Sequence, residues 1–507
     1  MAEQVVQNLL QQVGEAFDNA LDAHEPDVKP EEIGRVISVS EGVVWVEGIR
    51  SVKSEELLLV GPKEIPGMAL EILPAKVGVV LLGSGEGLRS GAEVTRANRV
   101  LDVPVGMDLL GRIVDPLGRP KDRKDPIRPE ERFPMQRDAP AIMHRAPVQT
   151  PVQTGLKVVD ALIPIGRGQR ELIVGDRQTG KTAVALDTII NQKGQDMVCI
   201  YCSIGQRSSS VAKVVEDLKH HDALEYTVVV VVDGEEQSGL QYIAPYAATS
   251  MGEYFMGKGR DVLIVYDDLT RHARAYRQLS LLLRRPPGRE AFPGDIFYIH
   301  SRLLERSTHL KPEYGGGTLT ALPIIETEAQ NISAYIPTNL ISITDGQLYF
   351  NPELFQKGHM PAIDVGLSVS RVGGKTQLPA YRRVAGDIRL SYTQFQELES
   401  FSRFGTRLDE KTKNQLEHGR RVRELLKQDQ YSPLSAGAQI VILLGVSKGY
   451  FDDIPVDRLG EAENRVLNSA RGELGDLNET VARAEKDDPV WDRLSDLIEA
   501  AVKDLKE

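Results

Sequence analysis

The chain has 507 residues, of which 41% are hydrophobic and 26% are charged. These fractions are close to those of soluble globular proteins and exclude a disordered or fibrous chain. At roughly 150 residues per domain, the length predicts about three domains. The 61 Lys and Arg against 73 Asp and Glu give a net charge of −12, which disfavours general attraction to nucleic acid or anionic lipid.

Apolar residues at helical spacing predict an amphipathic helix at the N-terminus, followed by a linker, within residues 1–30. The helix either packs on its own domain or docks a partner, and the spacing leaves both open. We find no basic leader followed by an apolar segment, and no apolar run approaching about 18 residues. Neither a targeting signal nor a membrane-spanning helix is therefore expected.

Short β-branched runs separated by glycine occupy residues 31–97 and predict a small antiparallel barrel or sandwich. Residues 98–379 alternate between strand and helix patterns, which is typical of an α/β domain. Four of its runs are almost continuously apolar, as in parallel strands buried on both faces. These runs cover residues 172–175, 198–204, 227–232 and 262–266.

Residues 380–507 show no strong strand signal after about Arg389 and predict a helical C-terminal domain. Amphipathic patterns predict helices over 401–426 and 459–502. One apolar stripe, which we interpret as core packing, consists of Val466, Ala470, Leu474, Leu477 and Val481. The sequence thus predicts a multidomain chain: an N-terminal β-barrel, a central α/β domain and a helical C-terminal domain.

The chain has only two cysteines, Cys199 and Cys202, too few for a disulfide scaffold, which indicates a reducing compartment. Their C-x-x-C spacing also occurs in redox and metal sites. Here it lies in an apolar run, where a strand would turn residues three apart toward opposite faces. We therefore interpret the pair as buried strand packing.

The segment Gly175-Asp-Arg-Gln-Thr-Gly-Lys-Thr182 fits the phosphate-loop pattern G-x-x-x-x-G-K-[ST]. It follows a predicted strand and opens a predicted helix, as the mechanism requires. Backbone N–H groups of such a loop surround phosphates at the positive end of a helix. We expect Lys181 to contact the β and γ phosphates and the Thr182 hydroxyl to bind Mg²⁺.

A second magnesium-organising group is expected at the end of a buried strand. The run Val262 to Asp268 supplies Asp267 as the first choice and Asp268 as the second. A strand ending in Asp is common by itself. Together with the upstream phosphate loop, however, it predicts a site for Mg²⁺ and a nucleotide.

Hydrolysis needs a group that orients and polarises water, usually a carboxylate beyond the strand that follows the phosphate-loop helix. In this sequence that strand ends at Gln206. A carboxamide cannot take up a proton near neutral pH, although glutamine positions water in some GTPases. We therefore expect slow or absent turnover at this chain's own site.

A strand-like run over 365–371 delivers Arg371 into a glycine-rich turn. An arginine in such a place could stabilise charge on a transferring phosphoryl group, an effect of about 10³ to 10⁵ in rate. From the residues alone, a surface or salt-bridged arginine is the simpler interpretation.

At these residues the chain closely resembles the α subunits of rotary F-type ATP synthases. The longest similar segments are Pro151–Glu171, Tyr276–Glu290, Pro293–Arg306 and Ala334–Gly346. The resemblance covers about residues 34–450 and implies the same three domains, the central one a RecA-like P-loop NTPase domain. It implies ATP and Mg²⁺ as ligands, bound without turnover.

The resemblance also implies partners. These are a β subunit in an alternating α/β hexamer, the central-stalk γ subunit, δ and b-type subunits of a peripheral stalk, and an ion-translocating membrane sector. No nucleic acid is expected. The expected location is peripheral to an energy-transducing membrane, at the cytoplasmic face of a bacterial or archaeal plasma membrane.

By the same resemblance, Arg371 reaches into the neighbouring β subunit's catalytic site, and Ser368 lies in the same turn. Positions that match the family's adenine pocket are Phe355, Gln428 and Gln430. The full expected nucleotide set is Gly175, Asp176, Arg177, Gln178, Thr179, Gly180, Lys181, Thr182, Gln206, Asp267, Phe355, Gln428 and Gln430, with Thr182 and Asp267 as magnesium ligands.

Some residues depart from the family pattern. Met360 stands where the family usually has arginine, and Arg271-His272 replaces the usual Lys-Gln. The first 30 residues are also unusual. These differences indicate a divergent branch, such as a second synthase copy in its organism.

Two other classes of protein compete with this interpretation. A self-sufficient homohexameric motor ATPase would carry a glutamate where this chain has Gln206. A ring-shaped RNA translocase would need a basic platform with interleaved aromatic residues, which the acidic composition does not favour. The non-catalytic subunit of vacuolar-type enzymes is similar too, but it lacks the intact phosphate-loop pattern.

Overall fold

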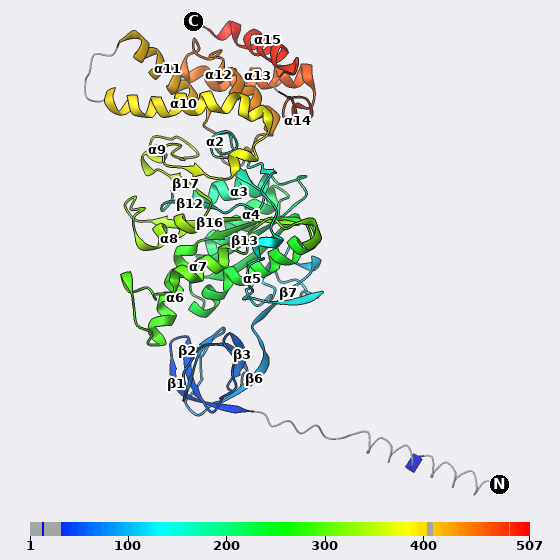
Figure 1. Cartoon of the computed structure of the whole chain (residues 1–507), viewed down its shortest axis with the longest axis vertical. Coiled ribbons are helices and arrows are strands. Elements are labelled where there is room, and N and C mark those ends of the chain that lie inside the picture. The colour runs from blue at the N-terminus through cyan, green and yellow to red at the C-terminus, as the bar shows by residue number, and fades with distance from the viewer. Residues whose placement is uncertain (1–12, 15–31, 403–408, 486, 507) are drawn as a thin grey trace, which may run out of the picture.

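The computed structural model describes residues 13–14, 32–402, 409–485 and 487–506. A β-barrel, an α/β unit and a helical unit follow one another along the long axis (Figure 1). This arrangement confirms the predicted fold class. The helix predicted within residues 1–30 lies, apart from residues 13–14, outside the described residues.

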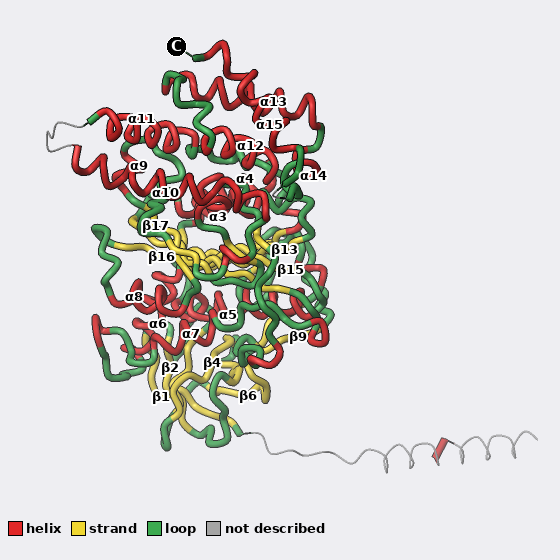
Figure 2. The backbone as a smooth tube through the Cα atoms, turned by 45° about the horizontal axis from the view of Figure 1, so that its top comes forward, coloured by secondary structure: helices red, strands yellow, loops and turns green. Residues whose placement is uncertain are grey.

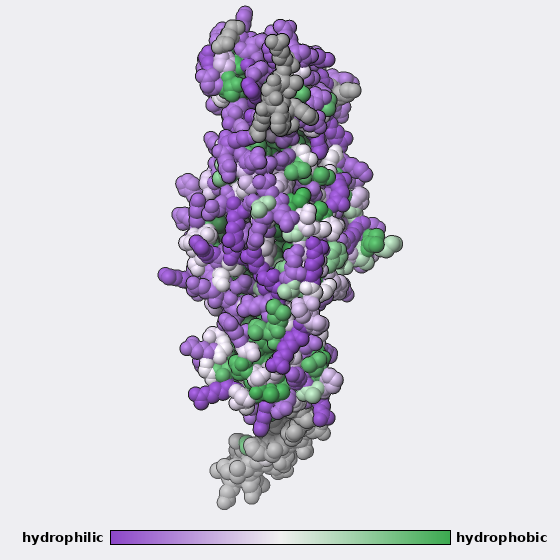
Figure 3. Space-filling view, turned by 90° about the vertical axis from the view of Figure 1, so that its left-hand side faces the viewer, coloured by the Kyte–Doolittle hydropathy of each residue, from purple (hydrophilic) through white to green (hydrophobic). Residues whose placement is uncertain are grey.

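The N-terminal strands close into a barrel in the order β1-β2-β5-β4-β3-β6, so the barrel alternative of the prediction is confirmed. The strands are β1 (Ile33–Ser40), β2 (Val43–Glu47), β3 (Glu56–Val60), β4 (Ile65–Ile72), β5 (Val77–Leu81) and β6 (Glu93–Val100). Hydrophobic residues nevertheless reach the surface over this part of the molecule (Figure 3).

Strand β2 joins the barrel to the central unit because both of its faces are buried. Val44 and Val46 belong to the barrel interior. Val43 and Trp45, which alternate with them, belong to the apolar core of the central unit. Because side chains alternate between the two faces of a strand, β2 contributes to both cores and so attaches the barrel to the central unit.

The central sheet has the order β18-β17-β12-β16-β15-β13-β14-β8. Every neighbouring pair is parallel except β17 with β18. The strands are β8 (Ile113–Val114), β12 (Glu171–Asp176), β13 (Met197–Gln206), β14 (Thr227–Asp233), β15 (Asp261–Asp267), β16 (Thr318–Thr327), β17 (Gly346–Phe350) and β18 (Val369–Ser370). All four predicted apolar runs are strands of this sheet. Short strands outside it are β7 (Asp102–Val105), β9 (Glu131–Pro134), β10 (Pro151–Val152) and β11 (Ile165–Gly166).

Helices cover both faces of the sheet (Figure 2). They are α3 (Lys181–Ile190) and α4 (Ser208–His220) on one face, and α5 (Ser238–Gly257), α6 (Leu269–Leu282) and α7 (Ile296–Leu304) on the other. Cys199 packs with the first group and Cys202 with the second, as predicted for strand packing. Burial raises the pKa of both thiols, which makes them poor nucleophiles.

The C-terminal unit is helical, as predicted, but the predicted helix bounds are wrong. Its helices are α10 (Pro379–Ser402), α11 (Glu410–Leu425), α12 (Ala436–Ser447), α13 (Leu459–Leu474), α14 (Leu477–Thr480) and α15 (Val490–Val502). The run 459–502 divides because Gly475 adopts a φ of 67° and ends α13. Four residues of the predicted apolar stripe are buried in the core, and Leu474 packs against it.

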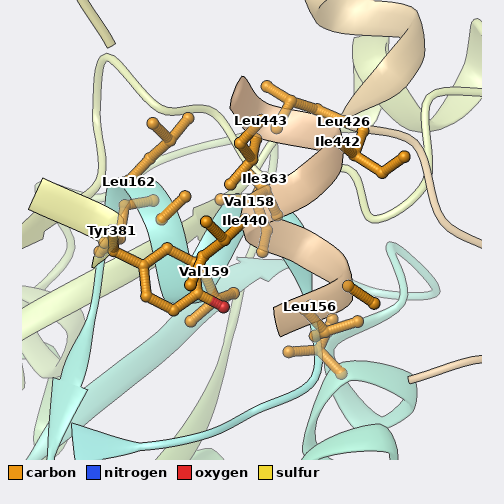
Figure 4. Close-up of a cluster of buried hydrophobic side chains, with 14 of the residues drawn as sticks. Leu156, Val158, Val159, Leu162, Ile363, Tyr381, Leu426, Ile440, Ile442 and Leu443 are labelled. Carbon is orange, nitrogen blue, oxygen red and sulfur yellow. The ribbon is translucent and has the colours of Figure 1, made fainter. Parts of the chain in front are cut away.

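The α/β and helical units share one apolar core. In Figure 4, Val158 and Val159 of α2 (Lys157–Leu162) meet Ile440 and Leu443 of α12. The ammonium of the buried Lys157 adds an ion pair to Glu463 of α13 at 2.7 Å. In the part of the chain that the structure describes, no helix is long and apolar enough to cross a membrane.

Candidate nucleotide site

The phosphate-loop sequence lies between β12 and α3, in the strand–loop–helix context predicted for it. Gly180, at the helix N-cap, has a φ of 94°, a conformation that glycine adopts without strain. The Lys181 side chain is buried, and its ammonium donates to the carbonyls of Gly175 at 2.9 Å and Asp176 at 2.5 Å. Burial lowers the pKa of this lysine.

Side chains on neighbouring elements hold the loop in shape. Asp176 accepts hydrogen bonds from the Thr327 hydroxyl at 2.6 Å and from the Gln330 N–H at 3.0 Å. The Thr179 hydroxyl donates to the carbonyl of Asp176 at 2.8 Å, and Arg177 pairs with Glu326 at 2.8 Å. Asp176 and Thr179 therefore contribute to the loop's own structure.

Thr182 and Asp267 meet at the carboxyl ends of β12 and β15. The Thr182 hydroxyl donates to Oδ2 of Asp267 at 2.8 Å, and the Tyr201 phenol donates to the same oxygen at 2.7 Å. Burial raises the pKa of Asp267. Hydroxyl and carboxylate oxygens suit a hard cation such as Mg²⁺, so the two predicted magnesium ligands fit that role.

Asp268, the second choice for the acidic ligand, has another task. Its Oδ1 accepts the N–H of Arg271 at 2.9 Å and so caps α6. Burial, with repulsion from Asp267, raises the pKa of Asp268 to about 7. The geometry therefore favours Asp267 as the ligand.

The departures Arg271 and His272 face different surroundings. Arg271 donates to the carbonyl of Gly205, next to Gln206, at 2.6 Å. His272 is fully buried, with its Nδ1 at 3.3 Å from Nε2 of His300. Of these two residues, only Arg271 donates a hydrogen bond to the backbone next to Gln206.

Gln206 ends β13 and faces the magnesium ligands. Its amide nitrogen donates to Oδ1 of Asp267 at 3.0 Å. The register brings Ser203 opposite Asp267, and β13 continues to Gln206, which pairs with Asp233 of β14 after an irregularity at Ile204. The side chain at the expected water-activating position is therefore a hydrogen-bond donor to a carboxylate.

A pocket of about 410 Å³ opens between α3, α4 and the segment after α11. Its lining contains five of the predicted residues: Gln178, Thr182, Gln206, Asp267 and Gln430. Tyr201 and Tyr431 also line the pocket and were not predicted from the sequence. Tyr201 lies in an apolar strand that indicates only core packing, and Tyr431 lies in a turn that matches no site motif.

The remaining adenine-pocket candidates lie outside this lining. Phe355, on α9 (Pro352–Gln356), is 36% exposed. The Gln428 side chain donates to the carbonyls of Gly155 and Ser432, each at 2.7 Å, and its N–H donates to the Met360 carbonyl at 2.8 Å. Their contact with a nucleotide stays a prediction.

The structure does not bring Arg371 to this chain's own loop. Arg371 follows β18, whose Ser370 pairs with Gly346, and Gly346 pairs in turn with Glu171 at the start of β12. The loop leaves the other end of β12, about 16 Å away at roughly 3.3 Å per residue. The predicted strand over 365–371 is wrong in length, because only Val369–Ser370 pairs with a neighbour.

Arg371 is exposed, and its guanidinium donates to the carbonyls of Ile341 at 3.0 Å and Thr344 at 2.8 Å. These carbonyls belong to the C-terminal end of α8 (Tyr335–Ile343), where the helix dipole favours a cation. Ser368 is buried instead. Its hydroxyl donates to the Asp364 carbonyl at 2.6 Å and accepts the Tyr349 N–H at 2.9 Å.

Three family models match the chain in order: the ATP synthase alpha/beta β-barrel domain over residues 31–98, the nucleotide-binding domain over 155–370 and the C-terminal domain over 377–504. The chain is 58% identical over 480 residues to "ATP synthase subunit alpha 2" of Syntrophus aciditrophicus, covering 95% of this chain and 92% of that protein. The chain belongs to the ATP synthase alpha/beta family, as an alpha subunit.

Further alpha subunits support this assignment. "ATP synthase subunit alpha 1" of Chlorobium luteolum is 58% identical over 498 residues, which are 97% of this chain and 96% of that protein. "ATP synthase subunit alpha 1" of Marinomonas is 59% identical over 467 residues, with 92% and 91% covered. Several relatives are named "ATP synthase subunit alpha 2", which agrees with the second-copy interpretation of the departures.

As an alpha subunit, the chain is one component of a multi-subunit, nucleotide-binding ATP synthase. Within the described residues, no group of three or more His, Cys, Asp or Glu side chains could hold a metal ion. The Thr182–Asp267 pair differs from such a cluster because bound phosphates would complete the coordination of Mg²⁺.

Proposed function

We propose that this chain is the non-catalytic alpha subunit of a rotary ATP synthase, which holds Mg-ATP at its own site and acts at a neighbouring beta subunit's site. The loop Gly175–Thr182 binds the phosphates, and Asp267 and Thr182 hold Mg²⁺. The metal neutralises phosphate charge when bound. The other roles in this proposal belong to side chains of this chain.

The first part of the proposal, that ATP is not hydrolysed at this chain's own site, rests on Gln206. Its amide nitrogen donates to Asp267 at 3.0 Å, so this side chain is oriented by the site. A carboxamide takes no proton from an attacking water near neutral pH. We therefore expect ATP to stay intact on this chain.

The second part of the proposal, that this chain acts at a neighbouring subunit's site, rests on Arg371. It is exposed and held by backbone carbonyls, at the opposite end of β12 from the phosphate loop. An arginine in this position is available to a site on another subunit, where it would stabilise the transferring phosphoryl group. We propose that this site belongs to a beta subunit in an alternating hexamer around a γ subunit, joined through peripheral δ and b-type subunits to an ion-translocating membrane sector.

The test is single-turnover hydrolysis of γ-labelled Mg-ATP by the purified full chain, alone and with a matching beta subunit. We expect ATP bound to the lone chain to remain intact, and turnover to appear only with beta. Rapid hydrolysis by the lone chain would contradict the proposal and favour a self-sufficient motor ATPase.

A further inference from the structure

The segment between α11 and α12 runs from the helical domain to the wall of the nucleotide pocket. Gln430, in this segment, lines the pocket together with Thr182 and Asp267. Tyr431 follows it and adopts a φ of 62°, a left-handed conformation that is uncommon for an aromatic residue. Such a conformation persists only where surrounding contacts determine it.

Tyr431 has those contacts on two separate helices. Its N–H donates to Oδ1 of Asp187 on α3 at 2.9 Å. Its phenol donates to Oδ2 of Asp217 on α4 at 2.6 Å. The ring also stacks on His221, with centroids 4.9 Å apart and planes at 27°. One residue thus joins α3, α4 and the helical domain.

Both helices contribute side chains to the lining of the pocket. The N-terminus of α3 carries the phosphate loop, and α4 begins just after Gln206. Leu186, next to Asp187 on α3, lines the pocket, and so does Asp217 of α4 itself. The two hydrogen bonds of Tyr431 therefore connect the segment that carries Gln430 to both of these helices.

We propose that Tyr431 is a positioning residue, which holds the Gln430 wall against α3 and α4 and slows the release of the bound nucleotide. This inference rests on the proposed function, because it assumes that Mg-ATP occupies this pocket. The segment joins α11 to α12, and Ile440 of α12 packs with Val158 and Val159 of α2 (Figure 4). The same residue therefore links nucleotide retention to the helical domain.

The experiment follows dissociation of labelled Mg-ATP from the full-length chain after addition of excess unlabelled Mg-ATP. Tyr431→Phe keeps the ring and removes only the O–H group, and we expect release about tenfold faster, as for the loss of one hydrogen bond to a carboxylate. Asp217→Ala should give the same increase. Asp217→Asn retains an oxygen that accepts the phenol, so it should release ATP at nearly the wild-type rate.

A matched control uses another tyrosine–carboxylate hydrogen bond of the same length. The Tyr254 phenol donates to Glu130 at 2.6 Å, and neither residue lines the nucleotide pocket. Tyr254→Phe should leave ATP release unchanged. The double variant Tyr431→Phe/Asp217→Ala should release ATP no faster than either single variant, because both changes remove one bond.

Failure of this inference and failure of the proposed function give different results. A wild-type chain that retains no Mg-ATP would overturn the proposed function. A wild-type chain that retains it, with Tyr431→Phe and Asp217→Ala both releasing it at the wild-type rate, would overturn the role of Tyr431 alone. Equal acceleration by Asp217→Asn and Asp217→Ala would also contradict it, because the cause would then be the lost charge.

Discussion

The two ends of the parallel sheet differ in how their polar groups are paired. At the carboxyl end, Thr182 and Gln206 both donate hydrogen bonds to Asp267, and a phosphate loop lies beside them. At the amino end, Arg371 is exposed, and its guanidinium donates to the carbonyls of Ile341 and Thr344 at the C-terminal end of α8. The first end resembles a complete nucleotide site without a base, whereas the second presents a cation to the outside.

A carboxyl at the start of β12, that of Glu171, lies close enough to Arg371 for the two groups to interact electrostatically. Glu171 is fully buried, and burial raises its pKa well above the usual value, which favours the neutral acid. Its Oε2 accepts a hydrogen bond from Gln169 at 2.7 Å. The exposed guanidinium of Arg371 therefore bonds to backbone carbonyls and interacts with a carboxyl for which burial favours the neutral acid. Substitutions at each end of the sheet can test the difference between them.

Replacement of Arg371 should have the largest effect. Arg371→Ala in a reconstituted alpha/beta complex should lower multisite hydrolysis by about 10³-fold or more, because it removes charge stabilisation of the transferring phosphoryl group. Nucleotide binding to the isolated chain should not change. Steady-state ATPase assays together with equilibrium binding measure both quantities. Turnover near the wild-type rate would show that the exposed arginine has no role at the neighbouring site.

Replacement of Lys181 should act on the other end of the sheet. Lys181→Ala removes the buried ammonium of the loop and should weaken Mg-ATP binding to this chain by about 100-fold, as for loss of a charge-assisted hydrogen bond. Equilibrium dialysis with the full chain measures this change. Arg371→Ala is the matched control, since it removes a cation outside the pocket. Unaltered binding by Lys181→Ala would mean that the loop is not a working phosphate site.

The sequence predicts the carboxyl end of the sheet better than the amino end. Lys181 and Thr182 follow from a local pattern, and Asp267 follows from a strand ending, because parallel strands bring their carboxyl ends to one edge. The position of Arg371 depends on the pairing of β18 with β17, a contact between segments separated along the chain. No local pattern encodes that pairing, so the predicted strand was too long.

The helical domain shows the same limit. Helix α12 was missed because it is buried all round, so its residues lack the amphipathic period that marks a surface helix. Tyr431 was missed because its partners, Asp187 and Asp217, belong to distant helices. Tertiary packing, which a single sequence does not display, decides both.

Two buried histidines, His272 and His300, should make the folded chain less stable at acid pH. Burial lowers the pKa of His300 to about 4 and that of His272 well below its usual value. The unfolded chain binds these protons below about pH 6.5, whereas the folded chain does not, so stability is lost as the pH falls from 6.5 toward 4. His300 alone corresponds to about 3 kcal/mol over that window.

Urea unfolding at pH 7 and at pH 4.5 measures this loss. The double variant His272→Gln/His300→Gln cannot take up these protons and should lose less stability than the wild-type chain between the two pH values. Mg-ATP binding at pH 7 should not change, because neither histidine lines the pocket. Equal losses in the two proteins would show that other groups control acid unfolding.

Replacement of Ser368 should have the smallest effect. It tests whether this serine only supports the turn beside Arg371 or takes part in catalysis. Its buried hydroxyl bonds to two backbone groups, the Asp364 carbonyl and the Tyr349 N–H. Ser368→Ala leaves that N–H without this partner and should lower the free energy of unfolding by about 1–2 kcal/mol. If Ser368 only supports the turn, turnover of the alpha/beta complex at a temperature where the variant is folded should fall far less than in Arg371→Ala. A loss as large as that of Arg371→Ala would instead place the serine hydroxyl in the catalytic chemistry at the amino end of the sheet.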